Sequence, residues 1–175
     1  MQFHLEDELI ILRPLQKDDF DALYQVAKDP LIWEQHPCSD RYQQEKFRIF
    51  FEDSIESKGA FVIIDKSNSS IIGSTRFKKI KRATNAIEIG WTFLARDKWG
   101  GVYNRTAKKL MIDYALEHLD YVVFYVDKNN QRSIRAVQKL GAVLIEGDLN
   151  KSHLSPVDSN LTFRIGKDEL TRPLL

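Results

Sequence analysis

The feature that most constrains the fold is a strand pattern that runs into a glycine-containing turn and then into an amphipathic helix. Residues 86–94 are rich in β-branched and aromatic side chains, which predicts a strand. Trp99-Gly100-Gly101 follows, and apolar residues then recur at helical spacing as far as Leu119. Such a turn aims backbone N–H groups that lack intrahelical partners at one point, where the helix dipole adds positive potential. An anion such as a phosphate is the natural ligand there, although a plain strand-to-helix connection would show the same pattern.

The flanking sequence alternates between strand and helix patterns and predicts one α/β domain over residues 1–175 with a mixed sheet. Strands are expected at residues 9–12, 60–64, 71–79, 86–94, 121–126, 142–145 and 161–165. Helices are expected at residues 17–28, at 40–57 with Gly59 in the terminal turn, after the glycine turn, and at 130–141. The three consecutive strands from 60 to 94 should form an antiparallel meander, because their connections are too short for crossovers. On the helix after the glycine turn, the residues expected to face the core are Ala107, Leu110, Met111, Tyr114 and Ala115.

Composition excludes several classes of protein. Hydrophobic residues make up 43% and charged residues 29% of the 175 positions, as in ordinary globular domains. A net charge of +1 argues against a dedicated nucleic-acid surface, and no apolar run approaches the roughly 20 residues needed to span a bilayer. There is no signal-peptide pattern, so the cytoplasm is the expected location. The four histidines show no ligand spacing, which predicts no metal site, and Cys38 is better explained as a packed small residue than as a nucleophile.

Two further stretches carry candidate chemistry. Asn130 and Ser133 begin the fourth predicted helix, where plain N-capping would also explain them. Glu88 lies inside an apolar strand, and strand alternation places it on one face with Gly90 and Thr92. A carboxylate among apolar neighbours is expected to have a raised pKa, which suits a general base, unless this strand leaves it exposed to solvent. The basic run 78–82 fits a solvated hairpin tip better than a binding site for an acidic partner.

In order and spacing, these segments resemble the GNAT superfamily of N-acetyltransferases, and most closely its branch of ribosomal-protein N-terminal acetyltransferases (RimJ/RimL-like). The residues that carry the resemblance are Leu12-Arg13-Pro14-Leu15, Ile72-Gly73-Ser74-Thr75-Arg76-Phe77, Glu88-Ile89-Gly90-Trp91, Trp99-Gly100, Asn104, Ala107-Lys108, Asn130-Gln131-Arg132-Ser133, Lys139-Leu140-Gly141-Ala142 and Glu146-Gly147. It extends over nearly the whole chain, and no single motif in it is strong.

The resemblance implies a mixed, mostly antiparallel sheet flanked by about four helices, in which two splayed strands form a cofactor cleft. It implies acetyl-CoA as the cofactor and direct transfer of acetyl to a primary amine, either a protein or peptide N-terminus or a small molecule. The pantetheine arm would pair with the strand end, and the pyrophosphate would lie on the N–H groups of the glycine turn. The cofactor-binding residues so implied are Phe93, Leu94, Lys98, Gly100, Gly101, Val102, Tyr103, Asn104, Asn130 and Ser133.

The resemblance also assigns roles in catalysis. Glu88 would accept the proton of the amine, and Ser133 would protonate the departing thiolate. The acceptor pocket would be lined by Trp33, His36 and Tyr42 and covered by the polar segment 146–160. A homodimer is the expected oligomer.

Two residues depart from the superfamily pattern in the glycine turn. Asp97 stands where Arg or Gln is usual, and Val102 stands where a small residue is usual. A degenerate GNAT domain, which binds CoA or a partner without catalysis, is therefore the alternative. A small nucleic-acid binder would rest on the basic run 78–82 alone.

Overall fold

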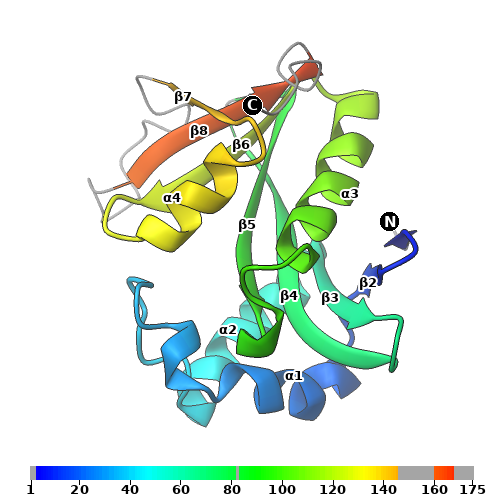
Figure 1. Ribbon diagram of the computed structural model, residues 1–175, viewed down its shortest axis with the longest axis vertical. Coiled ribbons are helices and arrows are strands. Elements are labelled where there is room, and N and C mark those ends of the chain that lie inside the picture. Colours follow the sequence, from blue (N-terminus) through cyan, green and yellow to red (C-terminus); the bar gives the residue numbers. More distant parts are fainter. Residues whose placement is uncertain (1–2, 82, 146–159, 168–175) are drawn as a thin grey trace.

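The computed structural model describes residues 3–81, 83–145 and 160–167, in which eight strands form one sheet with the order β1-β2-β3-β4-β5-β6-β8-β7 (Figure 1). The strands are β1 (Leu5–Glu6), β2 (Ile10–Pro14), β3 (Ala60–Asp65), β4 (Ser70–Lys79), β5 (Ala86–Leu94), β6 (Tyr121–Asp127), β7 (Val143–Ile145) and β8 (Asn160–Gly166). The α-helices are α1 (Phe20–Ala27), α2 (Gln44–Ser57), α3 (Tyr103–His118) and α4 (Gln131–Gln138). Three short 3-10 helices are η1 (Lys17–Asp19), η2 (Pro30–Ile32) and η3 (Arg96–Lys98).

The sheet confirms the expected fold class. Strands β3, β4 and β5 form the predicted antiparallel meander, and β5 pairs in parallel with β6. The other strand pairs among the described residues are antiparallel, so the sheet is mixed and mostly antiparallel. Strand β1 was not predicted, because two residues are too short to show a period.

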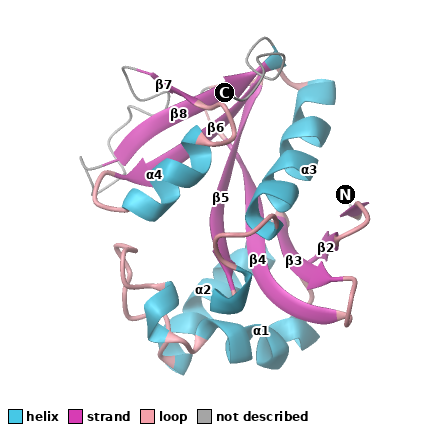
Figure 2. Ribbon diagram, viewed as in Figure 1, coloured by secondary structure: helices cyan, strands magenta, loops and turns pink. Residues whose placement is uncertain are grey.

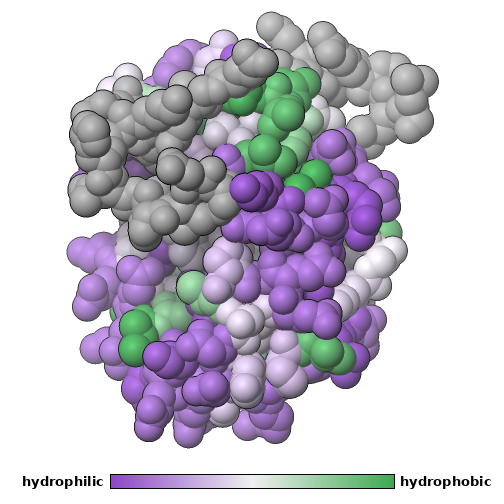
Figure 3. Space-filling model, turned by 90° about the vertical axis from the view of Figure 1, so that its left-hand side faces the viewer, coloured by the Kyte–Doolittle hydropathy of each residue, from purple (hydrophilic) through white to green (hydrophobic). Residues whose placement is uncertain are grey.

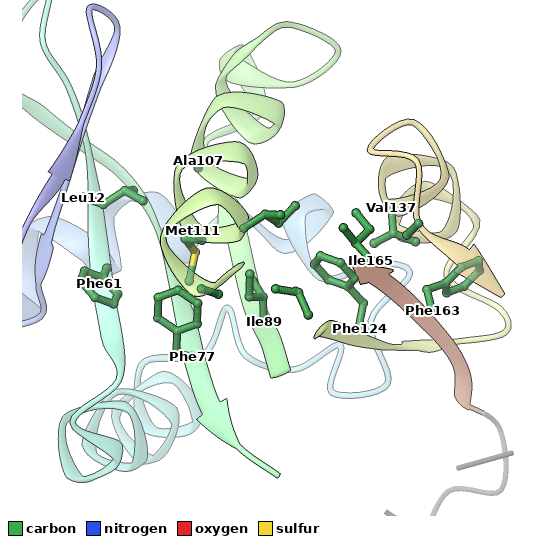
Figure 4. Close-up of a cluster of buried hydrophobic side chains, with 14 of the residues drawn as sticks. Leu12, Phe61, Phe77, Ile89, Ala107, Met111, Phe124, Val137, Phe163 and Ile165 are labelled. Atoms are coloured by element: carbon green, nitrogen blue, oxygen red, sulfur yellow. The ribbon is translucent and has the colours of Figure 1, made fainter. Parts of the chain in front are cut away.

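Helices cover both faces of the sheet (Figure 2). Helix α3 packs on one face, where Met111 and Ala107 meet Phe77, Ile89 and Phe124 in the larger core cluster (Figure 4). Helices α1 and α2 pack on the other face in a second cluster, whose buried members include Leu23, Phe47, Phe50, Phe51, Val62 and Phe93. Burying one such side chain contributes about 1.5–3 kcal/mol, so these two clusters fix both layers against the sheet.

The buried stripe of α3 differs from the predicted one. Ala107, Met111 and Ala115 are buried as expected, whereas Leu110 and Tyr114 are only partly buried. The residues buried in their place are Lys108, Ile112 and Leu116. The stripe is shifted because α3 lies against both β5 and β6, and Lys108 contacts Thr92 of β5 and Phe124 of β6.

Helix α2 is shorter than predicted, and it ends differently. It begins at Gln44 rather than near residue 40. The left-handed residue at its end is Lys58, with φ 53°, so the prediction that Gly59 forms this turn is wrong. Gly59 is required for another reason: a Cβ there would lie 2.3 Å from the carbonyl oxygen of Phe77 in β4.

Strand β5 contains a bulge that changes which side chains share a face. Ser74 pairs with Phe93 and Arg76 pairs with Gly90, so β5 carries one more residue than β4 in this interval. Trp91 adopts φ 51° at the bulge. Thr92 consequently reaches Thr75 at 2.8 Å on the α3 side, and the predicted alternation of Glu88, Gly90 and Thr92 on one face is wrong for Thr92.

Strands β5 and β6 separate after a short paired stretch. They pair only at residues 86–88 and 121–123 among the described residues. Beyond that, β5 stays on β4 as far as Leu94 and β6 stays on β8 as far as Asp127. The two strands are therefore splayed, as the resemblance implied (Figure 1).

Candidate functional site

The splayed strands turn part of their edges toward the gap between them. In the described part of the chain, β5 beyond residue 88 pairs with β4 but not with β6, and β6 beyond residue 123 pairs with β8 but not with β5. Some carbonyl oxygens in these stretches already accept hydrogen bonds, among them that of Leu94 from the indole Nε1 of Trp99 at 3.0 Å and that of Asp127 from the N–H of Asn130 at 2.9 Å. An extended ligand could add to such an edge as an extra strand.

The glycine turn at the end of β5 presents an unused set of donors. The backbone N–H groups of residues 100–105 donate to no acceptor within residues 3–81, 83–145 and 160–167. Gly100 has φ 70°, which favours glycine, and a Cβ built at Gly100 or Gly101 would meet nothing within 4 Å. The 16-residue helix α3 begins here, so its dipole adds positive potential to these donors. The turn is therefore suited to an anion.

The start of α4 differs, because its donors are already used. The backbone N–H of Ser133 donates to Asn130 Oδ1 at 3.0 Å, and that of Arg132 donates to Gln35 Oε1 at 3.1 Å. The N–H of Ile134 reaches the carbonyl oxygen of Asn130 at 3.0 Å. Asn130 is thus an N-cap, as the simpler interpretation of the sequence had it. The amide Nδ2 of Asn130 and the hydroxyl of Ser133 have no hydrogen-bond partner among the described residues, so both remain able to bind a ligand.

Two side-chain cations next to the glycine turn, Lys98 and Arg96, are paired with carboxylates. Lys98 Nζ lies 2.9 Å from Asp65 Oδ2, and the hydroxyl of Tyr103 donates to the same oxygen at 2.8 Å. The Lys98 hydrogen bond, with others from Ser67, holds the pKa of the buried Asp65 carboxyl well below its usual range. Arg96 is paired with Asp29. The structure therefore leaves the backbone, rather than Lys98, as the main donor set of the turn.

The two residues that depart from the superfamily pattern are both on the surface. The side chain of Asp97 is 73% exposed and lies 3.8 Å from Lys98 Nζ. Val102 is 45% exposed and occupies the N-cap position of α3. Gly101, Val102 and Asn104 all belong to the segment whose N–H groups are unused.

Lys108 is a buried cationic residue that the sequence did not single out. It is 6% exposed, donates a hydrogen bond to Thr92 and lies with Nζ 5.7 Å from the centre of the Phe124 ring. Burial lowers its pKa to about 7. A lysine in a helix is ordinarily expected in solvent, but Lys108, Ile112 and Ala115 share one face of α3, and that spacing was the available signal.

Glu88 is buried in β5, so the alternative of a solvent-exposed carboxylate is wrong. The residue is 8% exposed, and its Oε1 lies 3.5 Å from the position that a Cβ of Gly90 would occupy. Gly90 pairs with Arg76 across to β4. The guanidinium of Arg76 lies 3.8 Å from the centre of the Trp91 ring and 2.6 Å from Asp53. A carboxylate, an arginine and an aromatic ring therefore lie together on the face that α1 and α2 cover.

The predicted acceptor residues occupy different environments. Trp33 is 3% exposed and belongs to the core, where its Nε1 donates to the carbonyl oxygen of Ala27 at 2.7 Å. Tyr42 is exposed. His36 lines a cavity of about 320 Å³, together with Glu34, Gln35, Pro37, Asp127 and Asn129. The predicted cover from residues 146–159 lies outside the described part of the chain.

Arg132 connects this cavity with the glycine turn. Its guanidinium donates to the carbonyl oxygen of Ile32 at 2.8 Å and lies 4.1 Å from the centre of the Trp99 ring. The side of the molecule that carries α4 and residues 30–43 is mostly hydrophilic where it is coloured, with hydrophobic residues in small separate patches (Figure 3). A ligand that enters here meets a largely polar surface.

Within the described part of the chain, no helix is both long enough and apolar enough to cross a membrane. No group of three or more His, Cys, Asp or Glu side chains in this part of the chain is arranged to hold a metal ion.

Comparison with known proteins gives a family match and structural neighbours. The family profile described as acetyltransferase (GNAT) domain matches residues 10–143. No curated protein matches the chain. Among solved structures, the GNAT-family acetyltransferase from Bacillus anthracis is 18% identical, with a TM-score of 0.74 over 95% of this chain and 99% of that one. A GCN5-related N-acetyltransferase from Brucella melitensis is 18% identical, with a TM-score of 0.77 over 97% and 80% of the two chains. Mycobacterium smegmatis RimJ in complex with CoA-disulfide is 15% identical, with a TM-score of 0.65 over 98% and 89%. At these identities the neighbours establish a shared fold.

Proposed function

This chain belongs to the GNAT acetyltransferase family, and we propose that it transfers an acetyl group from acetyl-CoA to a primary amine. The observation that carries the proposal is the unused row of backbone N–H groups from Gly100 to Arg105, placed where β5 and β6 have separated. A helix N-terminus with free donors suits a pyrophosphate, and the splayed edge suits an extended chain. A family neighbour, RimJ from M. smegmatis, was solved with a CoA derivative.

The residues present fit the cofactor. The N–H groups of residues 100–104 would hold the phosphates, and the backbone at Phe93 and Leu94 would meet the pantetheine arm. The free amide of Asn130 would donate to the same arm. When bound, acetyl-CoA supplies an activated thioester. Backbone donors do not depend on side-chain identity, so the exposed Asp97 and Val102 are compatible with this arrangement.

The catalytic roles fall to two residues on separate elements. Glu88 is buried, and its carboxylate would take the proton that the amine must lose. Ser133, whose hydroxyl has no partner among the described residues, would give a proton to the departing thiolate. Neither role requires a covalent intermediate on the protein. Glu88 lies on β5 and Ser133 begins α4, the helix that follows β6, so one residue lies on the first of the two strands that separate and the other follows the second.

The alternative is a domain that binds CoA without transfer, and one observation favours it. Two of the basic side chains next to the turn, Lys98 and Arg96, are committed to Asp65 and Asp29. Neither is then free to pair with a phosphate, which leaves more of the binding to the backbone donors.

An acetyl-transfer assay against a panel of amines separates the two functions. Thiol release from acetyl-CoA is recorded with peptide N-termini, amino acids, polyamines and aminoglycosides as acceptors. The proposal predicts amine-dependent release and an acetylated amine by mass spectrometry. Tight CoA binding without transfer to any of them would favour the alternative.

A further inference from the structure

The segment between η2 and α2 contains more hydrogen-bond donors than it can satisfy. The backbone N–H of Cys38 donates to His36 Nδ1 at 2.9 Å, and Arg41 NH1 lies 3.2 Å from His36 Nε2. Burial and then the charge of Arg41 lower the pKa of His36 to about 4, so the ring is neutral at ordinary pH. A neutral imidazole has one lone pair and one N–H. If Nδ1 carries the proton, it faces the N–H of Cys38, and if Nε2 carries it, it faces the guanidinium of Arg41. One donor therefore faces another in either tautomer.

Arg41 itself has no carboxylate partner among the described residues. Its guanidinium lies 4.6 Å from the centre of the Phe50 ring and 5.7 Å from that of Trp33, and it forms no ion pair within the described residues. Burial lowers the pKa of Arg41 from its usual value. The two carboxylates whose charges raise its pKa are engaged elsewhere, Asp53 with Arg76 at 2.6 Å and Asp40 with Lys46 at 3.8 Å. A half-buried cation without a counter-ion is costly unless a ligand supplies one.

Arg41 lies on the same side of the sheet as Glu88. Phe50 and Trp33 belong to the core cluster between the sheet and α1 and α2, and Arg41 covers both rings. The charge of Arg76 lowers the pKa of Arg41, so the two side chains lie near each other. Arg76 of β4 also pairs with Gly90 of β5. The carboxylate of Glu88 lies beside Gly90, 3.5 Å from the position that a Cβ there would occupy. This face therefore presents a carboxylate for an amine and, further along, a cation for an anion.

We infer that the acceptor is a small primary amine that also carries a single carboxylate, which Arg41 and the His36 ring bind while the amine faces Glu88. An oxyanion would accept from both Arg41 NH1 and the ring N–H, which relieves the donor–donor contact. Glu34 and Asp127 line the adjoining cavity with His36, so a dianion such as phosphate is disfavoured. The inference rests on the proposed function and narrows its acceptor.

The reaction is that of the proposed function. The amine nitrogen forms a bond to the acyl carbon while the carbon–sulfur bond of the thioester breaks. The proton that the nitrogen loses passes to Glu88, and Ser133 protonates the thiolate. The carboxylate of the acceptor takes no part in the chemistry and serves only to position the amine.

Matched acceptors test the inference. Each amino acid is compared with its carboxamide and its aminophosphonate analogue by kcat/KM. For the amino acid with the preferred side chain, we expect kcat/KM to be about 10- to 100-fold higher for the carboxylate than for the carboxamide, which corresponds to about 1.4–2.8 kcal/mol. Arg41→Met, which keeps an apolar stem over Phe50, should bring the acid-to-amide ratio of kcat/KM down to about one. Equal rates for acid and amide in the wild type, or a preference for the phosphonate, would overturn the inference.

Arg48 provides the matched control. It also stacks on an aromatic ring, with its guanidinium 4.2 Å from the centre of Phe20, but it is exposed and is separate from the Arg41 contacts. Arg48→Met should leave the preference for the acid intact. If both variants lose the preference equally, arginine removal acts through stability and the inference fails.

A binding measurement tests the carboxylate site even if none of the amines is acetylated. Sodium acetate is titrated while the imidazole resonances of His36 are followed by NMR. A saturable shift in the wild type that is absent in Arg41→Met supports the site, and no shift in the wild type overturns it. Calorimetry with acetyl-CoA distinguishes failure of the proposed function from failure of the carboxylate site. An absence of acetyl-CoA binding contradicts the proposed function, whereas acetate binding at Arg41 does not depend on the cofactor.

Discussion

Lys108 of α3 donates a hydrogen bond to Thr92 of β5, four residues beyond the last residue that pairs β5 with β6. Its Nζ also lies 5.7 Å from the centre of the Phe124 ring, on the other separated strand. A single amine thus contacts both strands at the place where they have parted. It is buried without an ion pair in the described part of the chain, and this burial lowers its pKa to about 7.

Lys108→Met should stabilise the protein, and by an amount that depends on pH. The folded pKa of about 7 lies below the ordinary value of 10.5, so between these values the unfolded chain binds one more proton than the folded chain. Wild-type stability therefore rises from pH 7 to 10.5, and below pH 7 the full penalty applies. At about 1.4 kcal/mol per pKa unit, this penalty amounts to several kcal/mol.

Urea denaturation at pH 6, 8 and 10 measures the effect. The gain from Lys108→Met should be largest at pH 6 and smallest at pH 10. Lys109→Met serves as the control, since Lys109 is exposed and paired with Asp113, and it should show a small change without this trend. A gain in Lys108→Met that does not vary with pH would contradict a desolvated lysine.

Asp65→Asn should lower the thermal midpoint and weaken acetyl-CoA binding. The substitution removes the charge that holds Lys98 and Tyr103 at the start of α3. The folded pKa of Asp65 is depressed, so its contribution is present above the unfolded pKa and is lost as pH falls through the folded value. The thermal midpoints of the wild type and Asp65→Asn, measured by calorimetry, should therefore differ most near neutral pH and converge in acid. Ser67→Ala, which removes one of the weaker hydrogen bonds that lower this pKa, should have a smaller effect that also fades in acid.

Glu88→Gln should abolish the acidic limb of the pH–rate profile. Glutamine keeps the size of the side chain beside Gly90 but cannot accept a proton, so kcat/KM should fall by about 100-fold or more. Steady-state rates from pH 5 to 10 measure it, and unchanged acetyl-CoA affinity shows that the cleft is intact. A profile identical to that of the wild type would assign the proton to another group.

Ser133→Ala should lower kcat more than it lowers cofactor affinity. The backbone N–H of Ser133 still donates to Asn130, so the start of α4 keeps its cap when the hydroxyl is removed. Comparison of kcat with the dissociation constant of acetyl-CoA provides the measurement. Equal losses in both would make Ser133 a binding residue instead of an acid.

The sequence was sufficient for the elements that local patterns determine. Strand β5 has the predicted bounds. The connections of the meander are so short that β3, β4 and β5 can pair only as antiparallel neighbours, as they do. Asn130 was recognised at the start of α4 because a cap is a local signal. The bulge at Trp91 could not be predicted from the sequence, because it depends on the register between β5 and β4. It turns the side chain of Thr92 to the opposite face of the sheet from the one predicted.

The contacts that the sequence did not indicate join distant residues. Lys98, which is predicted to bind the cofactor, donates a hydrogen bond to Asp65, 33 residues away. Gln35 caps α4 from 97 residues away, and no period or motif indicates such a contact. Lys108 was overlooked because a lysine is ordinarily solvated, and only the packing of α3 against two separated strands buries it.

The central claim is that backbone donors at the start of α3 bind the cofactor, and calorimetry of acetyl-CoA with two variants of Val102 tests it most directly. Val102 has φ −83°, which proline can adopt, so Val102→Pro removes one N–H with little change in backbone shape. Val102→Ala removes the exposed side chain and keeps the N–H. We predict saturable binding to the wild type, equal or tighter binding to Val102→Ala, and binding about 10-fold weaker to Val102→Pro. No binding to the wild type, or equal affinity for both variants, would contradict the account.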